Sequence, residues 1–378
     1  GTVFVWIYGD YRQQSEQLTG AKRGGCHPIW LTKITHELFG QSMVVLDNSR
    51  NKVHEATCTV MEQPLKAPLN GIAMEFGYYP KPCDIATGRF SVQTLPDHES
   101  SVATVTGDPN VLKDWIYPGA QQQRDFMSGN VRSMPYNARV FGLPKTHVLT
   151  LHEGWSREEL DFVVWCLSFF FGMRLTTTEA GFLDATPIKS GVLVDFALVR
   201  CTVGDVIELA LDYLDSERGD TRAPKRVAAV IHALFLAQYP QSLPFEQFQY
   251  LYMALDACFK LVVVKEAQKP SVSHAGRVQW MCEKFDMPVP DWAKSDKATP
   301  SSLSVVRNDT VHEALFFDGP LGFSIYGGNQ PAADPGNTTL QMQAMVCRLL
   351  VAVLGNPGIS YVKTPVDTRQ RHALELRG

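Results

Sequence analysis

Three residues near the C-terminal end carry side chains that can act on a phosphate ester. Arg307, Asn308 and His312 occur in the order Arg-Asn-x-x-x-His within residues 301–317. A histidine can accept or donate a proton near neutral pH, and an arginine stays charged and can grip two phosphate oxygens at once. The asparagine can orient the imidazole or donate a hydrogen bond to phosphate. These are the groups needed to cleave RNA through its own 2′-hydroxyl.

The spacing is more specific than an Arg and a His alone. With this composition, an Arg-x-x-x-x-His match is expected by chance about half a time, and requiring Asn after the Arg lowers that to about one in a hundred. On a regular helix Asn308 and His312 share a face, whereas Arg307 lies about 140° away from His312. Arg307 can therefore reach the same point as His312 only if the first turn of the helix is loose or if the site is shared between two chains. The alternative interpretation of such residues is an ordinary salt bridge or helix cap.

Helices are expected to position this motif. From residue 202 onward the apolar residues recur at helical spacing, which indicates a bundle of about five helices. Ser301 or Ser302 is expected to cap the helix that holds the motif near its start, and Gly319-Pro320 is expected to close that helix. The other helices are predicted at residues 204–216, 226–239, 245–265, 273–285 and 338–354.

The first half of the chain has a different pattern. Short β-prone runs separated by Gly and Pro predict a sandwich or barrel-like sheet. Ser156 with Glu159 forms a capping-box pattern ahead of a buried helix at 160–173, and 191–201 is strand-like. The fold class is thus α+β, with a β-rich domain at 1–201 and an all-α bundle at 202–378, whose tail beyond residue 363 is expected to fray. The strands are predicted at residues 2–8, 42–47, 52–60, 71–79, 89–95 and 101–106, and as a paired set at 137–142 and 146–151.

The helical region resembles the HEPN family of helical-bundle ribonucleases, especially the ApeA-like HEPN proteins. The resemblance covers roughly residues 202–356. It rests on Arg307-Asn308-x-x-x-His312, on the preceding Val305-Val306, and on the long helix at 245–265. That helix carries Asp256 where the family often has an acid, more usually Glu.

The resemblance implies a function as well as a fold. It implies metal-independent RNA cleavage that leaves a 2′,3′-cyclic phosphate, with Arg307, Asn308, His312 and Asp256 as catalytic residues. It also implies a homodimer in which two motifs meet to form a composite site. The biological role would be prokaryotic anti-phage defence by abortive infection, with RNA such as tRNA as substrate. The N-terminal domain would then be the sensor of a phage-derived or other activating ligand.

Two other functions fit the same sequence. One is a non-catalytic adaptor, in which a HEPN-like bundle mediates dimerisation or RNA binding and the β domain binds a ligand. The other, a β-sandwich hydrolase built on Asp108, Asp114, His147 and His152, has no supporting spacing. Arg277 and Trp280 lie one turn apart on a predicted helix, and simple packing explains them.

Composition limits the remaining possibilities. The net charge is −4, so no global basic field would hold nucleic acid non-specifically. The eight cysteines form no Cys-x-x-Cys pair, which favours reduced thiols in a cytoplasmic protein without a metal or cofactor. The longest apolar run, 162–173, is well short of the roughly 20 residues of a membrane helix, so no membrane association is expected.

Overall fold

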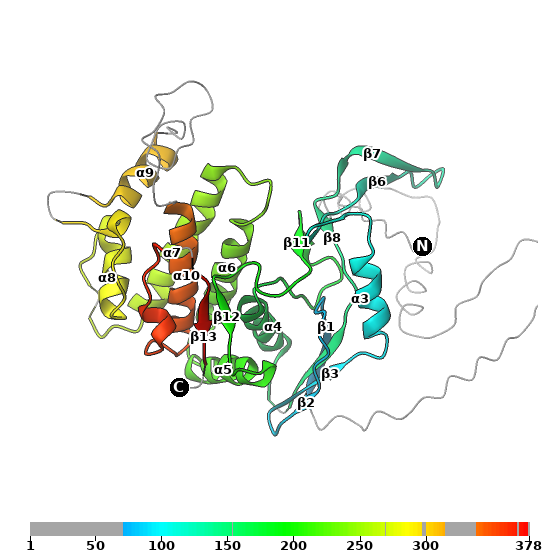
Figure 1. Ribbon diagram of the computed structural model, residues 1–378, viewed down its shortest axis with the longest axis horizontal. Helices are drawn as coiled ribbons and strands as arrows, with labels where there is room; N and C mark the ends of the chain where they lie inside the picture. The colour runs from blue at the N-terminus through cyan, green and yellow to red at the C-terminus, as the bar shows by residue number, and fades with distance from the viewer. Residues whose placement is uncertain are drawn as a thin grey trace, which may run out of the picture. The chain divides into compact units, whose positions relative to one another are not determined.

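The structure is a computed structural model (Figure 1). Its contacts divide the chain into two compact units. One unit combines Gly1–Ala67 with Gln122–Ser133, and the other combines Pro68–Gln121 with Met134–Gly378. The strands predicted between residues 2 and 60, and the predicted stop at Gly319-Pro320, lie outside the described residues. The structure describes residues 71–152, 154–268, 270–296, 300–313, 338–368 and 370–376.

Residues 122–133 are the described part of the first unit. They form the tip of a hairpin whose strands are β6 (Ala120–Arg124) and β7 (Val131–Asn137). The turn closes through Asp125, whose backbone N–H donates to the carbonyl of Asn130 at 2.8 Å. Its carboxylate accepts from Ser128 Oγ at 2.7 Å. Side chain and backbone of Asp125 therefore fix this turn locally, as is usual for Asp in turns.

A four-stranded antiparallel sheet is the main β structure of the larger unit. Its strand order is β1 (Ile72–Phe76), β9 (His147–Leu151), β3 (Phe90–Thr94) and β2 (Ile85–Ala86). Alternate residues of β9 are buried, so one face of this central strand packs into the core. The strands predicted at 71–79 and 89–95 are confirmed.

The predicted pairing of residues 137–142 with 146–151 is wrong. β9 lies between β1 and β3, with Leu151 opposite both Ile72 and Phe90, whereas β8 (Val140–Phe141) pairs with β10 (Phe182–Leu183). A local hairpin would satisfy one edge of β9, but the central position satisfies the backbone groups of both edges.

The strand predicted at 101–106 is also wrong, because these residues belong to helix α3 (His98–Thr106). The β-branched residues suggested a strand. In the helix, however, Thr104 and Thr106 donate to carbonyls four residues back, each at 2.8 Å. Ser101 and Val105, one turn apart, are buried, so the helix has an inner face.

The remaining described strands form small sheets rather than the predicted sandwich or barrel. Three short strands pair in the order β11-β5-β4, and β12 (Phe196–Leu198) pairs in parallel with β13 (His372–Leu374). Since β13 follows the last helix, the C-terminal region is not all-α. The three-stranded sheet consists of β4 (Val111–Leu112), β5 (Trp115–Ile116) and β11 (Thr186–Pro187).

The predicted helices are confirmed in the described residues. Ser156 and Glu159 form the expected capping box of the first of the buried helices, and Thr202 with Asp205 forms a second one. Apolar residues at helical spacing explain the buried faces. The helices are α4 (Arg157–Phe171), α5 (Val203–Ser216), α6 (Arg222–Leu236), α7 (Pro244–Val263), α8 (Arg277–Lys284), α9 (Ser302–Val311) and α10 (Thr338–Val353).

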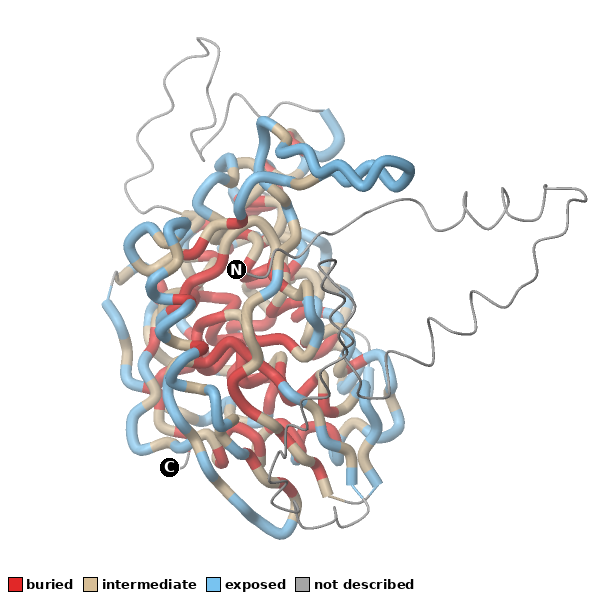
Figure 2. Tube along the Cα trace, turned by 90° about the vertical axis from the view of Figure 1, so that its right-hand side faces the viewer, coloured by how far each residue is buried: buried red, intermediate tan, exposed pale blue. Residues whose placement is uncertain are grey.

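The core of the larger unit runs from the sheet through the helices. α7 packs against α6, α8 and α10, while α4 packs against β1, α5 and α6. One cluster of buried apolar residues extends from Phe76 to Leu376, and Figure 2 shows it as the buried interior. The boundary predicted after residue 201 thus falls inside this unit, because α4 lies before it and its partners α5 and α6 lie after it.

The tail beyond residue 363 is anchored, contrary to the predicted fraying. Arg348 of α10 is buried and pairs with Asp195 at 2.8 Å. Its guanidinium also donates to the carbonyls of Thr364 at 2.9 Å and Pro365 at 3.1 Å. These bonds tie Thr364 and Pro365 to α10, and β13 pairs with β12.

Candidate active site

Helix α9 carries the motif and is fixed at its N-terminal end. Ser301 is the N-cap, as predicted: its Oγ accepts from the N–H of Ser304 at 3.3 Å and donates to the carbonyl of Ala275 at 2.9 Å. Leu303 and Val306 are buried, so the opposite face is directed outward. Figure 1 shows α9 beside α8, with both at one side of α7 and α10.

The motif lies at the end of α9, not at its start. The helix ends at Val311, and His312 is the C-cap residue, whose N–H donates to the carbonyl of Asn308 at 2.9 Å. Helix ends leave backbone groups that later residues must satisfy. Both Asn308 and His312 are exposed, so solvent and ligands can reach their side chains.

The structure brings Arg307, Asn308 and His312 together within one chain. Nη1 of Arg307 donates to Oδ1 of Asn308 at 3.0 Å and contacts Nε2 of His312. The expectation that Arg307 faces away from His312 is therefore wrong. The long arginine side chain reaches around the helix end, where no further turn of α9 blocks its path. The geometric reason for requiring a second chain is removed.

The contact defines the tautomer of the imidazole. A guanidinium has donors and no acceptor, so Nε2 of His312 must accept from Arg307. In a neutral ring that accepts at Nε2, the proton lies on Nδ1. A neutral imidazole can take up a proton once a ligand draws the guanidinium away, as general-base catalysis requires.

One face of α7 supports the motif. Tyr252, Asp256 and Phe259 lie three and four residues apart, hence on the same side of the helix. Cζ of Arg307 lies 5.9 Å from the centre of the Tyr252 ring, within cation–π range. Close by, the amide of Gln249 donates to Thr310 Oγ1 at 3.2 Å. The end of α9 therefore contacts α7 through Arg307 and Thr310.

Asp256 contacts a different arginine from the one in the motif. Its Oδ1 accepts from Arg277 of α8, whose Cζ lies 4.8 Å from the centre of the Phe259 ring. Nη2 of Arg277 lies 3.3 Å from Nε2 of His274. Asp256 thus joins a second arginine–histidine pair beside the motif, rather than binding Arg307 or His312 directly.

The sequence analysis missed His274 and Tyr252, and explained Arg277 as packing. Their signals were weak: His274 and Arg277 are three residues apart at a helix start, and Tyr252 precedes Asp256 by one turn. Neither spacing distinguishes a site from a helix surface. Only the approach of α8 and α9 to α7 shows that these residues meet.

The local electrostatics favour an anion. Burial lowers the pKa of His274, and the charge of Arg277 lowers it further. Arg307 and Lys260 act in the same direction, and Asp256 opposes them. Three cations against one carboxylate act on this imidazole, so a ligand carrying negative charge would be stabilised beside it.

The other candidate residues do not gather into a site. His147 is buried in the sheet, and His152 contacts the carbonyl of Gly88 at 3.1 Å. Asp114 pairs with Lys189 at 2.6 Å, and Asp108 accepts from a turn N–H at 2.7 Å. Each has a separate local role.

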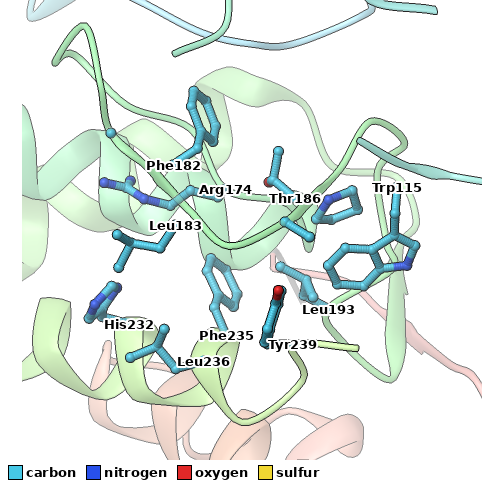
Figure 3. Close-up of a pocket in the computed structure, with 13 residues that line it drawn as sticks. Trp115, Arg174, Phe182, Leu183, Thr186, Leu193, His232, Phe235, Leu236 and Tyr239 are labelled. Atoms are coloured by element: carbon cyan, nitrogen blue, oxygen red, sulfur yellow. The ribbon is translucent and has the colours of Figure 1, made fainter. Parts of the chain in front are cut away.

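A pocket elsewhere in the larger unit is small. Figure 3 shows Arg174 and His232 towards one side and Trp115 at the other. Its volume is about 40 Å³, far below the several hundred Å³ of a typical ligand site. The guanidinium of Arg174 stacks on Trp165 at 3.5 Å, and burial lowers its pKa to about 9. This arginine is part of the packing.

Comparisons with protein-family models, with curated proteins and with solved structures gave no match. Within the described ranges, no three His, Cys, Asp or Glu side chains gather as metal ligands would. Of the helices described, none is long and apolar enough to cross a membrane.

Proposed function

We propose that this chain is a metal-independent endoribonuclease of the HEPN type, with His312 as an acid–base residue and Arg307 as the phosphate-binding residue. Asn308 holds the guanidinium through its side-chain oxygen, and Asp256 acts through Arg277. The observation that carries the proposal is the contact between Arg307 and His312 on an exposed helix end.

The reaction needs no group beyond those present. The 2′-hydroxyl of a ribose loses its proton to an imidazole, and its oxygen attacks the adjacent phosphorus. The bond from phosphorus to the 5′-oxygen breaks, and that oxygen takes a proton from an imidazolium. The products are a 2′,3′-cyclic phosphate and a 5′-hydroxyl. Arg307 stabilises the charge that builds up on the phosphoryl oxygens.

The biological setting follows from the family resemblance alone. In that setting the enzyme acts as a homodimer in prokaryotic anti-phage defence, cuts RNA such as tRNA, and is switched on when the N-terminal region binds a phage-derived or other ligand. A non-catalytic adaptor would use the same exposed end of α9 for binding RNA or a second chain.

The decisive experiment compares the wild-type protein with His312→Ala on total RNA, in chelator and with and without lysate of infected cells. We expect wild-type cleavage, cyclic-phosphate ends by mass spectrometry, and a loss of at least a hundredfold in the variant. Arg200→Ala is the matched surface control, because the Arg200 side chain is 83% exposed. Equal cleavage by His312→Ala would show that the activity does not arise at this site. No cleavage with any activator, together with retained RNA binding, would favour the adaptor.

A further inference from the structure

The second arginine–histidine pair is built like the first. Nη2 of Arg277 lies 3.3 Å from Nε2 of His274, just as Arg307 contacts Nε2 of His312. Since guanidinium groups only donate, each arginine presents a donor to Nε2 of its imidazole.

Both arginines are also held by a side-chain oxygen. Arg277 donates to Oδ1 of Asp256, and Arg307 donates to Oδ1 of Asn308. Their remaining donors can bind phosphate oxygens without moving the arginine backbone, because each guanidinium carries five N–H groups. Both guanidinium groups are thus already held in position in the free protein.

The two pairs share one support. Arg277 lies over Phe259 at 4.8 Å and Arg307 over Tyr252 at 5.9 Å, and both rings belong to the same face of α7. Burial raises the pKa of Tyr252, and the charges of Arg307 and Arg277 both oppose that rise. The pairs are therefore electrostatic neighbours on one chain.

Resting on the proposed function, we infer that His274 is the second catalytic imidazole and Arg277 the second phosphate-binding cation of the RNA-cleaving site. One chain then carries the two imidazoles and two guanidiniums that two copies of the motif would otherwise supply. His274 takes the proton of the 2′-hydroxyl, and His312 gives a proton to the departing 5′-oxygen. The proton taken and the proton given balance over the step.

The environment of each imidazole fits this assignment. The groups that act on His274 are Arg277, Asp256, Arg307 and Lys260. Partial loss of hydration and the three cations lower the pKa of His274, which favours the neutral form that a base requires. The phosphate of the substrate draws Arg307 away from His312, so that Nε2 becomes free to carry the proton that an acid must donate.

The first test is cleavage of a short single-stranded RNA under single-turnover conditions. We expect His274→Ala to lower the rate about a hundredfold and to remove the acidic limb of the pH–rate profile, with partial rescue by added imidazole. His274 is exposed, so the substitution leaves the fold intact. His152→Ala is the matched control and should cleave like wild type. If His312→Ala is inactive while His274→Ala keeps the wild-type rate and profile, the inference fails and the proposed function stands.

A mixing test shows whether the two imidazoles of one site come from the same chain or from two chains. Because each chain carries both imidazoles, mixing His274→Ala with His312→Ala should restore no activity. Recovery would mean that the two imidazoles come from different chains, and would overturn the inference.

A binding test does not depend on cleavage. The probe is a 2′-O-methyl RNA oligonucleotide, which cannot be cut, followed by fluorescence anisotropy at fixed salt. We expect Arg277→Gln and Arg307→Gln each to weaken binding about tenfold, since each removes a charge-assisted contact. Arg200→Gln serves as the control. Wild-type affinity in Arg277→Gln, or no binding by the wild-type protein, would overturn the inference even if no RNA cleavage is ever observed.

Discussion

Replacing Arg348 with methionine should remove the principal anchor of the C-terminal tail. The Arg348 side chain is 1% exposed and that of Asp195 26% exposed, so their ion pair is largely shielded from water. The same guanidinium satisfies the carbonyls of Ala344, Thr364 and Pro365 at 2.8 to 3.1 Å. Methionine has a similar length, so the change removes charge and donors while keeping most of the volume.

The expected cost follows from the loss of one partner of a buried pair. Such a loss destabilises by about 3–5 kcal/mol, because the other charge stays buried and unpaired. Against a typical stability of about 5–15 kcal/mol, this would lower the melting temperature by roughly 10 °C. The exposed pair Lys225–Glu158 is the matched control, since its side chains are 67% and 77% exposed. Lys225→Met should cost about 1 kcal/mol or less.

A double-mutant cycle tests the reasoning directly. Asp195→Asn keeps an acceptor for the hydroxyl of Tyr361, which donates to Asp195 Oδ1 at 2.5 Å, but leaves Arg348 without its counter-charge. With both substitutions the buried charges are gone together, so the combined loss should fall short of the sum by about 2–3 kcal/mol. Urea unfolding followed by circular dichroism measures each variant. A coupling energy below about 0.5 kcal/mol would refute the account of this pair.

Two further predictions concern the sheet and the end of α4. Burial, and next the charge of His98, lowers the pKa of His147 to about 4. In the unfolded chain the pKa of a histidine is about 6.5, so on acidification the unfolded chain binds the proton before the folded one does. The free energy of unfolding should therefore fall by about 3 kcal/mol between pH 6.5 and pH 4. Urea midpoints over that range should show a weaker pH dependence in His147→Phe; an unchanged dependence would contradict the assignment. Gly172 has a φ of +57°, and a Cβ there would lie 2.6 Å from Val194 Cγ2. Gly172→Ala should therefore lower the free energy of unfolding by about 2 kcal/mol or more. Gly154→Ala is the control and should cost about 1 kcal/mol, because φ is also positive there but no atom lies near the added Cβ. Equal losses of melting temperature in the two variants would show that the clash contributes nothing.

The helices could be predicted because their signals are local. The Ser156 capping box, the Ser301 cap and the apolar face of α7 each depend on residues within one or two turns. A side chain three or four residues away is a neighbour in any helix, so these patterns hold whatever the rest of the chain does. The local signal was misleading for α3, whose β-branched residues suggested a strand although Ser101 and Val105 form the inner face of a helix.

The strand partners could not be predicted in the same way. Alternation marks β9 as a half-buried strand, but alternation does not say which strands lie on either side of it. Its partners β1 and β3 both precede it by more than fifty residues. The sequence pattern instead favoured pairing with the nearest predicted strand, at residues 137–142. Long-range pairing depends on how the whole core is buried, which no local pattern records.

The motif shows what the sequence alone can predict and what it cannot. The residue types and spacing of Arg307, Asn308 and His312 indicated phosphate chemistry, because an arginine can bind phosphate oxygens and a histidine can transfer protons near neutral pH. The sequence also placed them on a capped helix. It did not determine where that helix ends, and the regular-helix assumption wrongly separated Arg307 from His312.

Only the tertiary structure decided what surrounds the motif. The end of α9 lets the Arg307 side chain reach His312, and α7 carries the two rings beneath the two guanidiniums. His274 and Arg277 come from a segment about thirty residues earlier, so their approach to the motif depends on how three helices pack. Local sequence fixes what each residue can do chemically, and packing fixes which residues can do it together.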